Sequence, residues 1–174
     1  GNAKTVNFGI VYGVSAFGLS QQTDLSRGES KELIETYYES YPKLREYIAS
    51  QINFARDNGY VETVLGRRRY LRDINSQNAV VRGAAERNAV NAPIQGSAAD
   101  IIKIAMISIQ KKIKAENWKS RMLLQVHDEL VFDVLKTEKE GFEKMIKSEM
   151  ENAFKLSVPL VVDIGFGNDW LEAH

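Results

Sequence analysis

The chain contains no cysteine among its 174 residues, which excludes disulfide bonds and thiolate metal sites and fits a cytosolic origin. No apolar run approaches the roughly 18 residues that cross a bilayer, and no signal peptide is visible. The charges cancel, with 23 basic and 23 acidic residues. Net charge therefore does not point to a nucleic-acid partner, and any basic surface has to be local. We expect a cytoplasmic protein.

A starting methionine is also missing, and a helical pattern begins within three residues without a cap. We interpret residues 1–3 as the scar of a tag and the chain as part of a longer protein. Hydrophobic residues make up 44% of the chain and charged residues 26%, which predicts a packed core rather than disorder. The length suits one domain or two small lobes.

The spacing of apolar residues predicts helices first, and then helices mixed with an antiparallel sheet. A capping box at Ser26, Pro42 in a first turn and a stop at Asn58-Gly59 mark helix ends. This order favours an α+β fold over a parallel α/β fold. The predicted elements are a first helical stretch over 4–23 that is interrupted near Gly13, helices over 26–41 and 42–58, a hairpin over 60–71, helices over 79–92 and from 97, a hairpin over 121–134, a helix from 137 and a strand over 158–164.

Four local signals in the second half guide these boundaries. Pro93 is expected to break or kink the helix before it, and Ser97-Ala-Ala-Asp100 resembles the cap of a new helix. Thr137-Glu-Lys-Glu140 resembles another cap. We expect Val158–Ile164 to be the last strand, beside the central hairpin, with Pro159 near its start as an edge strand permits.

The most informative feature is His127-Asp128-Glu129, which stands between apolar runs at 122–126 and 130–134. The runs predict strands, and the spacer fits only a tight turn. Such turns favour glycine because they need positive φ, so His-Asp breaks a local rule, which is typical of functional sites. Asp128 is the better Mg²⁺ ligand, because Glu129 should point to the opposite face. The alternative is an ordinary acidic turn.

Lys4, Phe8 and Tyr12 are four residues apart, which predicts that they lie along one stripe of a helix. The ammonium can bind phosphate as a point charge, and the rings can stack on a sugar or a base. Gly13 follows at once and allows a bend or a close approach. The row indicates a nucleotide-binding face. The alternative is an amphipathic helix with core aromatics and a solvated lysine.

Two other sets of polar residues suit a nucleic acid. Arg87, Asn91 and Gln95 follow one another at intervals of four, and their side-chain types reach base edges and sugar-phosphate. Arg67-Arg68-Arg69 and Arg72 put four arginines within six residues, which predicts a positive patch for phosphate. The alternatives are solvent-facing polar residues for the first set and a solvated face or ion pairs for the second.

Taken together, these segments resemble the motifs of the family A DNA polymerases, in the family's order and over essentially the whole chain. The resemblance implies part of the fingers at residues 4–80 and part of the palm at residues 81–174. The segments that carry it are Lys4-Thr-Val-Asn-Phe8-Gly-Ile-Val-Tyr12-Gly13, similar to motif B; Glu62-Thr-Val-Leu-Gly-Arg67-Arg-Arg-Tyr70 and Asn91-Ala-Pro-Ile-Gln95-Gly-Ser-Ala-Ala-Asp100, similar to the segments between; Gln125-Val-His127-Asp128-Glu129, similar to motif C; and Val158-Pro-Leu with Gly167-Asn-Asp-Trp170, similar to the family's C-terminal end.

The resemblance also implies roles for single residues. Lys4 would bind the phosphates of an incoming deoxynucleoside triphosphate, Phe8 would pack on its sugar, and Tyr12 would stack at the templating position. Phenylalanine rather than tyrosine at position 8 goes, in this family, with rejection of dideoxynucleotides. Asp128 would be one of two aspartates that bridge two Mg²⁺ ions, with Glu129 as an auxiliary carboxylate; with Lys4 these are the implied catalytic residues. Those implied to bind primer–template DNA are Tyr12, Gly13, Arg87, Asn91, Gln95 and His127.

The implied reaction is attack of a primer 3′-hydroxyl on the α-phosphate with loss of pyrophosphate, in template-directed DNA replication or repair. Motif A, which supplies the second metal-binding aspartate in the family, has no counterpart in this chain. The family's arginine just before motif B, its thumb and any exonuclease domain are missing as well. The resemblance therefore implies that the remaining polymerase domains complete the site, and that this chain alone does not polymerise.

Two other functions compete with this interpretation. A His-Asp metal phosphohydrolase would collect several histidines, and this chain has only His127 and His174. A non-catalytic nucleic-acid-binding relic of a polymerase would look the same over this part of the sequence. The residues upstream of Gly1 discriminate between them, because an aspartate in a motif A pattern indicates a polymerase and its replacement indicates a relic.

Overall fold

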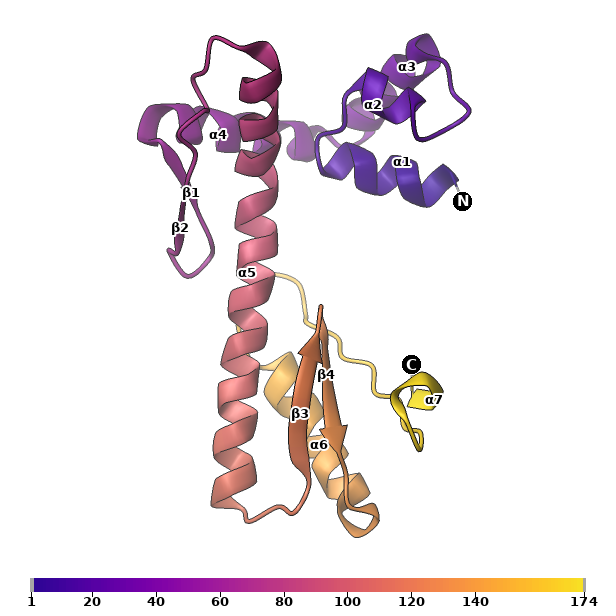
Figure 1. Cartoon of the computed structure of the whole chain (residues 1–174), viewed down its shortest axis with the longest axis vertical. Helices are drawn as coiled ribbons and strands as arrows, with labels where there is room; N and C mark the ends of the chain where they lie inside the picture. The colour runs from indigo at the N-terminus through magenta and orange to yellow at the C-terminus, as the bar shows by residue number, and fades with distance from the viewer. Residues whose placement is uncertain (1, 174) are drawn as a thin grey trace. The chain divides into compact units, whose positions relative to one another are not determined.

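The computed structural model describes residues 2–173 as an α+β chain of helices and two short antiparallel ladders (Figure 1). Two compact units meet at the bond between Gly96 and Ser97, inside the long helix α5. The elements are α1 (Asn2–Val11), α2 (Ala16–Ser20), α3 (Arg27–Ser40), α4 (Pro42–Asn58), β1 (Tyr60–Glu62), β2 (Arg68–Tyr70), α5 (Ala79–Ala115), β3 (Arg121–Val126), β4 (Glu129–Asp133), the 3₁₀ turn η1 (Lys136–Glu138), α6 (Lys139–Glu151) and α7 (Trp170–Ala173).

The first unit is built around small side chains. Alanines of α4 and α5 pack against the β1–β2 hairpin and the segment after it. β1 and β2 pair in antiparallel register from Tyr60 opposite Tyr70 to Glu62 opposite Arg68. The core residues are Ala55, Val61, Leu71, Ile74, Ala85, Ala89 and Ala92, with Ile52 partly buried against them.

The second unit packs the C-terminal part of α5 against α6 and the β3–β4 hairpin. Phe142 is at its centre, with ring centroids of Trp118 and Phe132 both 5.5 Å away in edge-to-face geometry, an arrangement that aromatic pairs prefer. β3 and β4 pair from Arg121 opposite Asp133 to Val126 opposite Glu129. The buried members of this core are Ala105, Ile109, Ile113, Phe142, Met145 and Ile146.

The helix-end signals in the first half of the chain are confirmed. Ser26 and Glu29 form both hydrogen bonds of a capping box, Pro42 occupies the first turn of α4, and Gly59 ends α4 in the left-handed region. Gly13, at φ 76°, ends α1 in a Schellman motif, in which the Val14 N–H donates to the Gly9 oxygen and the Gly13 N–H to the Ile10 oxygen.

The predicted helix break at Pro93 is wrong as a boundary. α5 continues through Pro93, and Ser97 and Asp100 are buried within it instead of capping a new helix. Proline in a helix interior costs about 3 kcal/mol or more. The neighbouring Ala89 and Ala92 are buried in the core of the first unit, and this tertiary packing offsets the local preference.

Two other predictions in the second unit are wrong. Thr137 does not cap α6: Glu138 is its N-cap residue, without a side-chain cap bond. The segment Val158–Ile164 has no strand assignment, and the Val162 N–H donates to the Glu151 carboxylate at 3.2 Å. A strand needs a ladder partner, and the Val162 N–H bonds to a side chain instead.

One helix of the described chain, α5, is long and apolar enough to cross a membrane when only length and composition are considered. A core helix of a water-soluble protein passes the same test. α5 contributes buried residues to the cores of both units.

Candidate functional site

The predicted row of Lys4, Phe8 and Tyr12 occupies one face of α1. Lys4 Nζ is 5.9 Å from the centroid of the Phe8 ring, and the rings of Phe8 and Tyr12 are stacked with centroids 6.2 Å apart and planes 29° apart. A core aromatic would be buried, but half of the Phe8 surface is exposed. This exposure favours a binding face over the alternative of an amphipathic core helix.

The other face of α1 anchors the row. Ile10 is buried, and the Tyr37 hydroxyl of α3 donates to the Asn7 side-chain oxygen at 2.6 Å. At the end of α1, a Cβ added to Gly13 would lie 3.8 Å from Arg87 Cγ. The structure therefore brings Gly13 and Arg87, which are predicted from separate motifs, to the same place in the first unit.

Arg87, Asn91 and Gln95 follow one another along α5. Arg87 and Gln95 are exposed. Asn91 is partly buried, and its Oδ1 atom is buried without a hydrogen-bond partner among the described residues. A buried acceptor without a partner costs about 1–3 kcal/mol, and such an atom in a native protein calls for an explanation, such as strain, a bound water or a functional role. Asn91 is thus the residue of this set with the strongest structural sign of a missing partner.

The arginine patch divides into residues with different contacts. Arg68 binds Glu62 at 2.8 Å and lies 4.3 Å over the Tyr60 ring, and the Glu62 hydrogen bond raises the pKa of Arg68. Arg67 donates to the Gly96 backbone oxygen. The ion-pair alternative thus holds for Arg68. A depression of about 90 Å³ joins the patch to Gln95 and is lined by Val61, Glu62, Thr63, Arg67, Arg68, Arg69, Ala92, Gln95 and Gly96.

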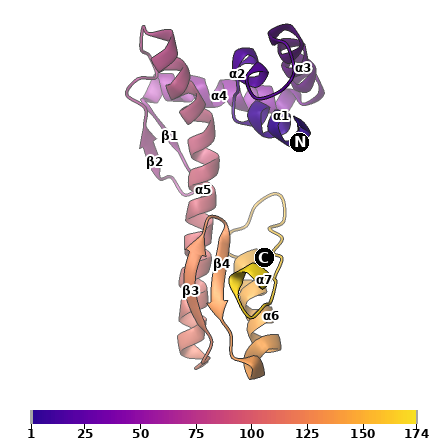
Figure 2. The same ribbon diagram turned by 45° about the vertical axis from the view of Figure 1, so that its right-hand side comes forward.

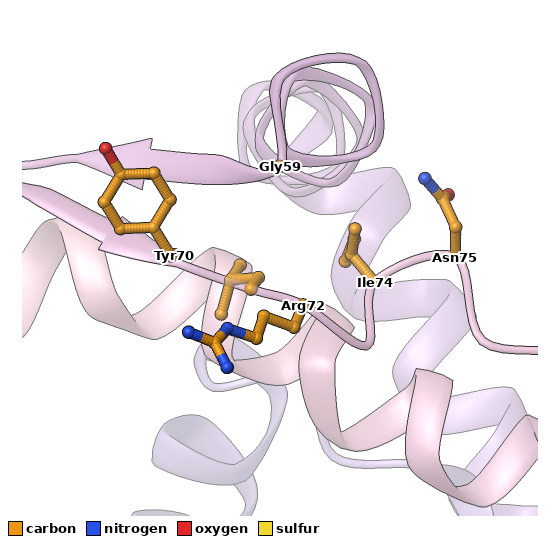
Figure 3. A pocket seen from close by; sticks show the side chains of 6 residues that line it. Gly59, Tyr70, Arg72, Ile74 and Asn75 are labelled. Carbon is orange, nitrogen blue, oxygen red and sulfur yellow. The ribbon is translucent and has the colours of Figure 1, made fainter.

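A larger cavity of about 500 Å³ lies where α4 ends and β2 leaves the hairpin. Figure 3 shows the Tyr70, Arg72, Ile74 and Asn75 side chains around it. Asn75 donates to the Arg56 backbone oxygen at 3.1 Å. Arg72, the fourth arginine of the predicted patch, therefore borders a different hollow from Arg67, Arg68 and Arg69.

The central hairpin has the predicted two-residue tip. His127 has φ 52°, and its side chain and that of Asp128 are exposed. Positive φ is uncommon outside glycine, although histidine is among the more tolerant residues. The Gln125 side chain donates to the His127 backbone oxygen at 2.8 Å, which steadies the turn. The strained residue thus lies beside the carboxylate that the sequence singles out, an association typical of functional sites.

Glu129 begins β4 opposite Val126 and is partly buried. The Trp170 indole of α7 donates to its Oε2 atom at 3.4 Å. An exposed carboxylate such as Asp128 suits a hard cation that keeps several waters. Within residues 2–173, however, no three histidine, aspartate or glutamate side chains gather as a metal-binding group. Asp128 therefore fits one ligand position of a Mg²⁺ site.

The structure groups the predicted residues into two sets. Lys4, Phe8, Tyr12, Gly13, Arg87, Asn91 and Gln95 belong to the first unit, and His127, Asp128 and Glu129 belong to the second. Gln125 and Trp170 join the hairpin set only in the structure. Gln125 is close to the tip in sequence, whereas Trp170 is 41 residues from its partner, a separation for which no spacing rule gives a signal.

Comparison with known proteins gives one consistent result. The model of DNA polymerase family A matches residues 1–172. DNA polymerase I of Streptococcus pneumoniae serotype 4 is 54% identical over 172 residues, and that of Caldicellulosiruptor bescii is 52% identical over 170 residues. These alignments cover 99% and 98% of this chain but 20% of each relative. The chain thus spans about a fifth of the length of these relatives.

A solved structure agrees with the sequence relatives. The POL domain of Pol1 from M. smegmatis, in complex with DNA primer-template and dNTP, superposes with a TM-score of 0.96 at 48% sequence identity. The match covers 99% of this chain and 30% of the chain in that structure.

Proposed function

Because this chain belongs to DNA polymerase family A, we propose that it is the part of a DNA-directed DNA polymerase that delivers the incoming nucleotide and supplies one metal-binding aspartate. The observation that carries this proposal is the exposed row on α1, where Lys4 approaches the Phe8 ring and Phe8 stacks on Tyr12. An ammonium followed by two rings matches the order of phosphate, sugar and base in a deoxynucleoside triphosphate.

The hairpin tip supplies the reaction's acidic group. Asp128 would hold Mg²⁺, and Glu129 would act beside it as an auxiliary carboxylate. Bound divalent ions stabilise the attacking and leaving oxygens of a phosphoryl transfer. The turn geometry supports this role, because the Gln125 bond to the His127 oxygen fixes the backbone from which the Asp128 carboxylate extends.

The partners follow from the same proposal. Primer–template DNA would contact Tyr12, Gly13, Arg87, Asn91, Gln95 and His127. The exposed Arg87 and Gln95 side chains support this assignment, because both carry donors that can reach sugar-phosphate or base edges. The remaining domains of a longer polymerase would complete the site, and we place that enzyme in the bacterial cytosol or nucleoid.

The isolated chain is proposed to be inactive. A two-metal site needs carboxylates from more than one segment, and the sequence contains motif C but no motif A. Restoring activity would therefore require the polymerase segment that supplies the second bridging aspartate.

A primer-extension assay tests both parts of the proposal. The intact polymerase that contains this sequence should extend a primer with Mg²⁺ and deoxynucleotides, and the isolated chain should give no extension above a no-protein control. Clear extension by the isolated chain would contradict its proposed inactivity. Absence of extension by an intact protein that still binds duplex DNA would instead favour the non-catalytic relic.

A further inference from the structure

The C-terminal helix α7 contacts the carboxylate next to the hairpin tip. Trp170 Nε1 donates to Glu129 Oε2 at 3.4 Å, and Figures 1 and 2 both draw α7 on the β4 side of the hairpin. Glu129 directly follows Asp128 in the chain. We propose that Trp170 is a positioning residue that orients the Glu129 carboxylate for catalysis, an inference that rests on the proposed function.

The last turn of the chain is built to hold the indole in place. The Glu172 N–H donates to Asp169 Oδ1 at 3.0 Å, while the Glu172 carboxylate accepts from the Asn168 backbone N–H and side-chain amide at 2.8 and 2.9 Å. This reciprocal arrangement resembles a capping box. It fixes the residues on both sides of Trp170 and thereby lowers the entropy cost of the contact with Glu129.

Two glycines let the chain fold back over this turn. A Cβ at Gly165 would collide with the backbone oxygen of Ala173, and a Cβ at Gly167 would lie 2.5 Å from the Cβ of Glu172. The obstructing groups are backbone or lie close to it, so they cannot swing away as the end of a long side chain does. A side chain at either glycine would therefore disturb the turn that presents Trp170.

The contact has the chemistry of an orienting interaction. An indole N–H is a donor only, and its bond to a carboxylate is charge-assisted. Half of the Trp170 surface is exposed, so the indole steers the carboxylate without removing it from solvent. The backbone position of Glu129 is set separately, by its pairing with Val126. The bond thus selects a side-chain direction rather than the fold of the hairpin.

The test uses the intact polymerase and the variant Trp170→Phe, which keeps an aromatic ring and removes the donor. We expect the maximal rate of nucleotide incorporation to fall about fivefold, the scale of one ordinary hydrogen bond at an exposed site, while the dissociation constant of the nucleotide stays unchanged. Glu129→Gln should lower the same rate. The double variant should be no slower than Glu129→Gln alone, because Trp170 is proposed to act only through the carboxylate that Glu129→Gln removes.

The chain offers a matched control. Trp118 also donates its indole N–H to a glutamate, Glu116, at 2.8 Å, but it packs against the Phe142 core. Trp118→Phe should leave the incorporation rate within twofold of the parent. A slowdown equal to that of Trp170→Phe would overturn the proposal, because loss of any indole–carboxylate bond would then suffice.

A second readout does not depend on activity. In the intact enzyme labelled with 5-fluorotryptophan, the ¹⁹F resonance lost in Trp170→Phe is that of Trp170. Glu129→Gln should shift this resonance and leave that of Trp118 in place. The positioning role would be overturned if the two substitutions slowed incorporation additively in the double variant. It would also be overturned if Glu129→Gln left the Trp170 resonance unmoved. Failure of the positioning role is distinguishable from failure of the proposed function, because only the latter would appear as retained turnover in Asp128→Ala.

Discussion

Arg67 donates from Nη2 to the backbone oxygen of Gly96 at 3.1 Å, which ties the β1–β2 hairpin to α5. Thr63 holds the loop of that hairpin, because its hydroxyl accepts the backbone N–H groups of Leu65 and Arg67 at 3.3 and 3.2 Å. A Cβ added to Gly96 would lie 2.6 Å from Thr63 Cγ2. The hairpin and the helix thus meet at a contact that has no room for another methyl group.

Gly96→Ala is therefore expected to destabilise the protein. A helix interior favours alanine over glycine by about 1 kcal/mol, but overpacking costs about 1–3 kcal/mol, and threonine is stiff at χ1. We expect a net loss of about 1 kcal/mol in the free energy of unfolding, measured by urea denaturation of the intact polymerase.

The effect of Gly96→Ala should also be measured in a protein that carries Thr63→Ser. Serine lacks Cγ2 but keeps the hydroxyl, so Gly96→Ala should become neutral or stabilising when Thr63 is replaced. Gly83→Ala on the same helix is the control. An added Cβ there meets only Arg87 Nη1, at 3.8 Å, and we expect a gain of about 0.5–1 kcal/mol. Equal effects of Gly96→Ala in both backgrounds would refute the steric explanation.

Asp128→Ala in the intact polymerase should lower turnover by about a hundredfold or more and should largely spare DNA binding. The expected reason is loss of a metal ligand at an exposed turn. Single-turnover incorporation and a duplex-binding titration measure the two properties. Asp133→Ala is a control at the far end of the same hairpin, where Asp133 pairs with Arg121 at 3.1 Å in an exposed salt bridge and should matter little. Retained turnover in Asp128→Ala would remove Asp128 from the metal site.

Phe8→Tyr should ease the incorporation of dideoxynucleotides. The added hydroxyl can take the place of the missing 3′-hydroxyl as a polar partner, and one hydrogen bond corresponds to about a tenfold change in preference. Competition between dideoxynucleotides and deoxynucleotides in primer extension measures the ratio. Phe17→Tyr adds the same hydroxyl to an exposed ring on α2 and should leave the ratio unchanged. An unaltered ratio for Phe8→Tyr would show that Phe8 does not contact the sugar.

Glu138 links η1 to the segment before β3 and should make stability depend on acid. Its carboxylate accepts the backbone N–H groups of Lys119 and Ser120 and the Ser120 hydroxyl. These bonds hold the pKa of Glu138 below its ordinary value of 4.5, and the bond from the Lys119 backbone N–H has the largest effect. Because the folded-state pKa is lowered, the stabilisation is complete above about pH 4.5 and is lost as the pH falls through the folded-state value.

Glu138→Gln should therefore lower the midpoint temperature of thermal unfolding at pH 7. The difference in midpoint temperature between variant and parent should become smaller below pH 4.5. Melting curves between pH 3 and 7 measure this gap. Glu140→Gln, at an exposed position on α6, is the control and should track the parent at every pH. A gap for Glu138→Gln that stays constant down to pH 3 would contradict the link to Glu138 ionisation.

Local rules were sufficient for much of the fold. The capping box at Ser26, the prolyl first turn at Pro42 and the glycine stop at Gly59 act within one helical turn, so the sequence predicts these ends without tertiary information. The short spacer between the apolar runs at 122–126 and 130–134 likewise predicts a tight hairpin turn, although His-Asp is a poor choice of residues for it. The family resemblance, which rests on ordered motifs, is confirmed by the comparisons.

Long-range packing decided the rest. By itself, the sequence determined the α+β class, the helix ends at Ser26, Pro42 and Gly59, the two hairpins and the chemical types of the candidate site residues, because these depend on neighbours a few positions apart. Only the tertiary structure carried α5 through Pro93, left Val158–Ile164 outside the sheet, paired Arg68 with Glu62 and brought Trp170 to Glu129. Each of these outcomes depends on which surfaces and hydrogen-bonding groups meet across long stretches of chain, and the spacing of residues along a sequence does not encode that directly.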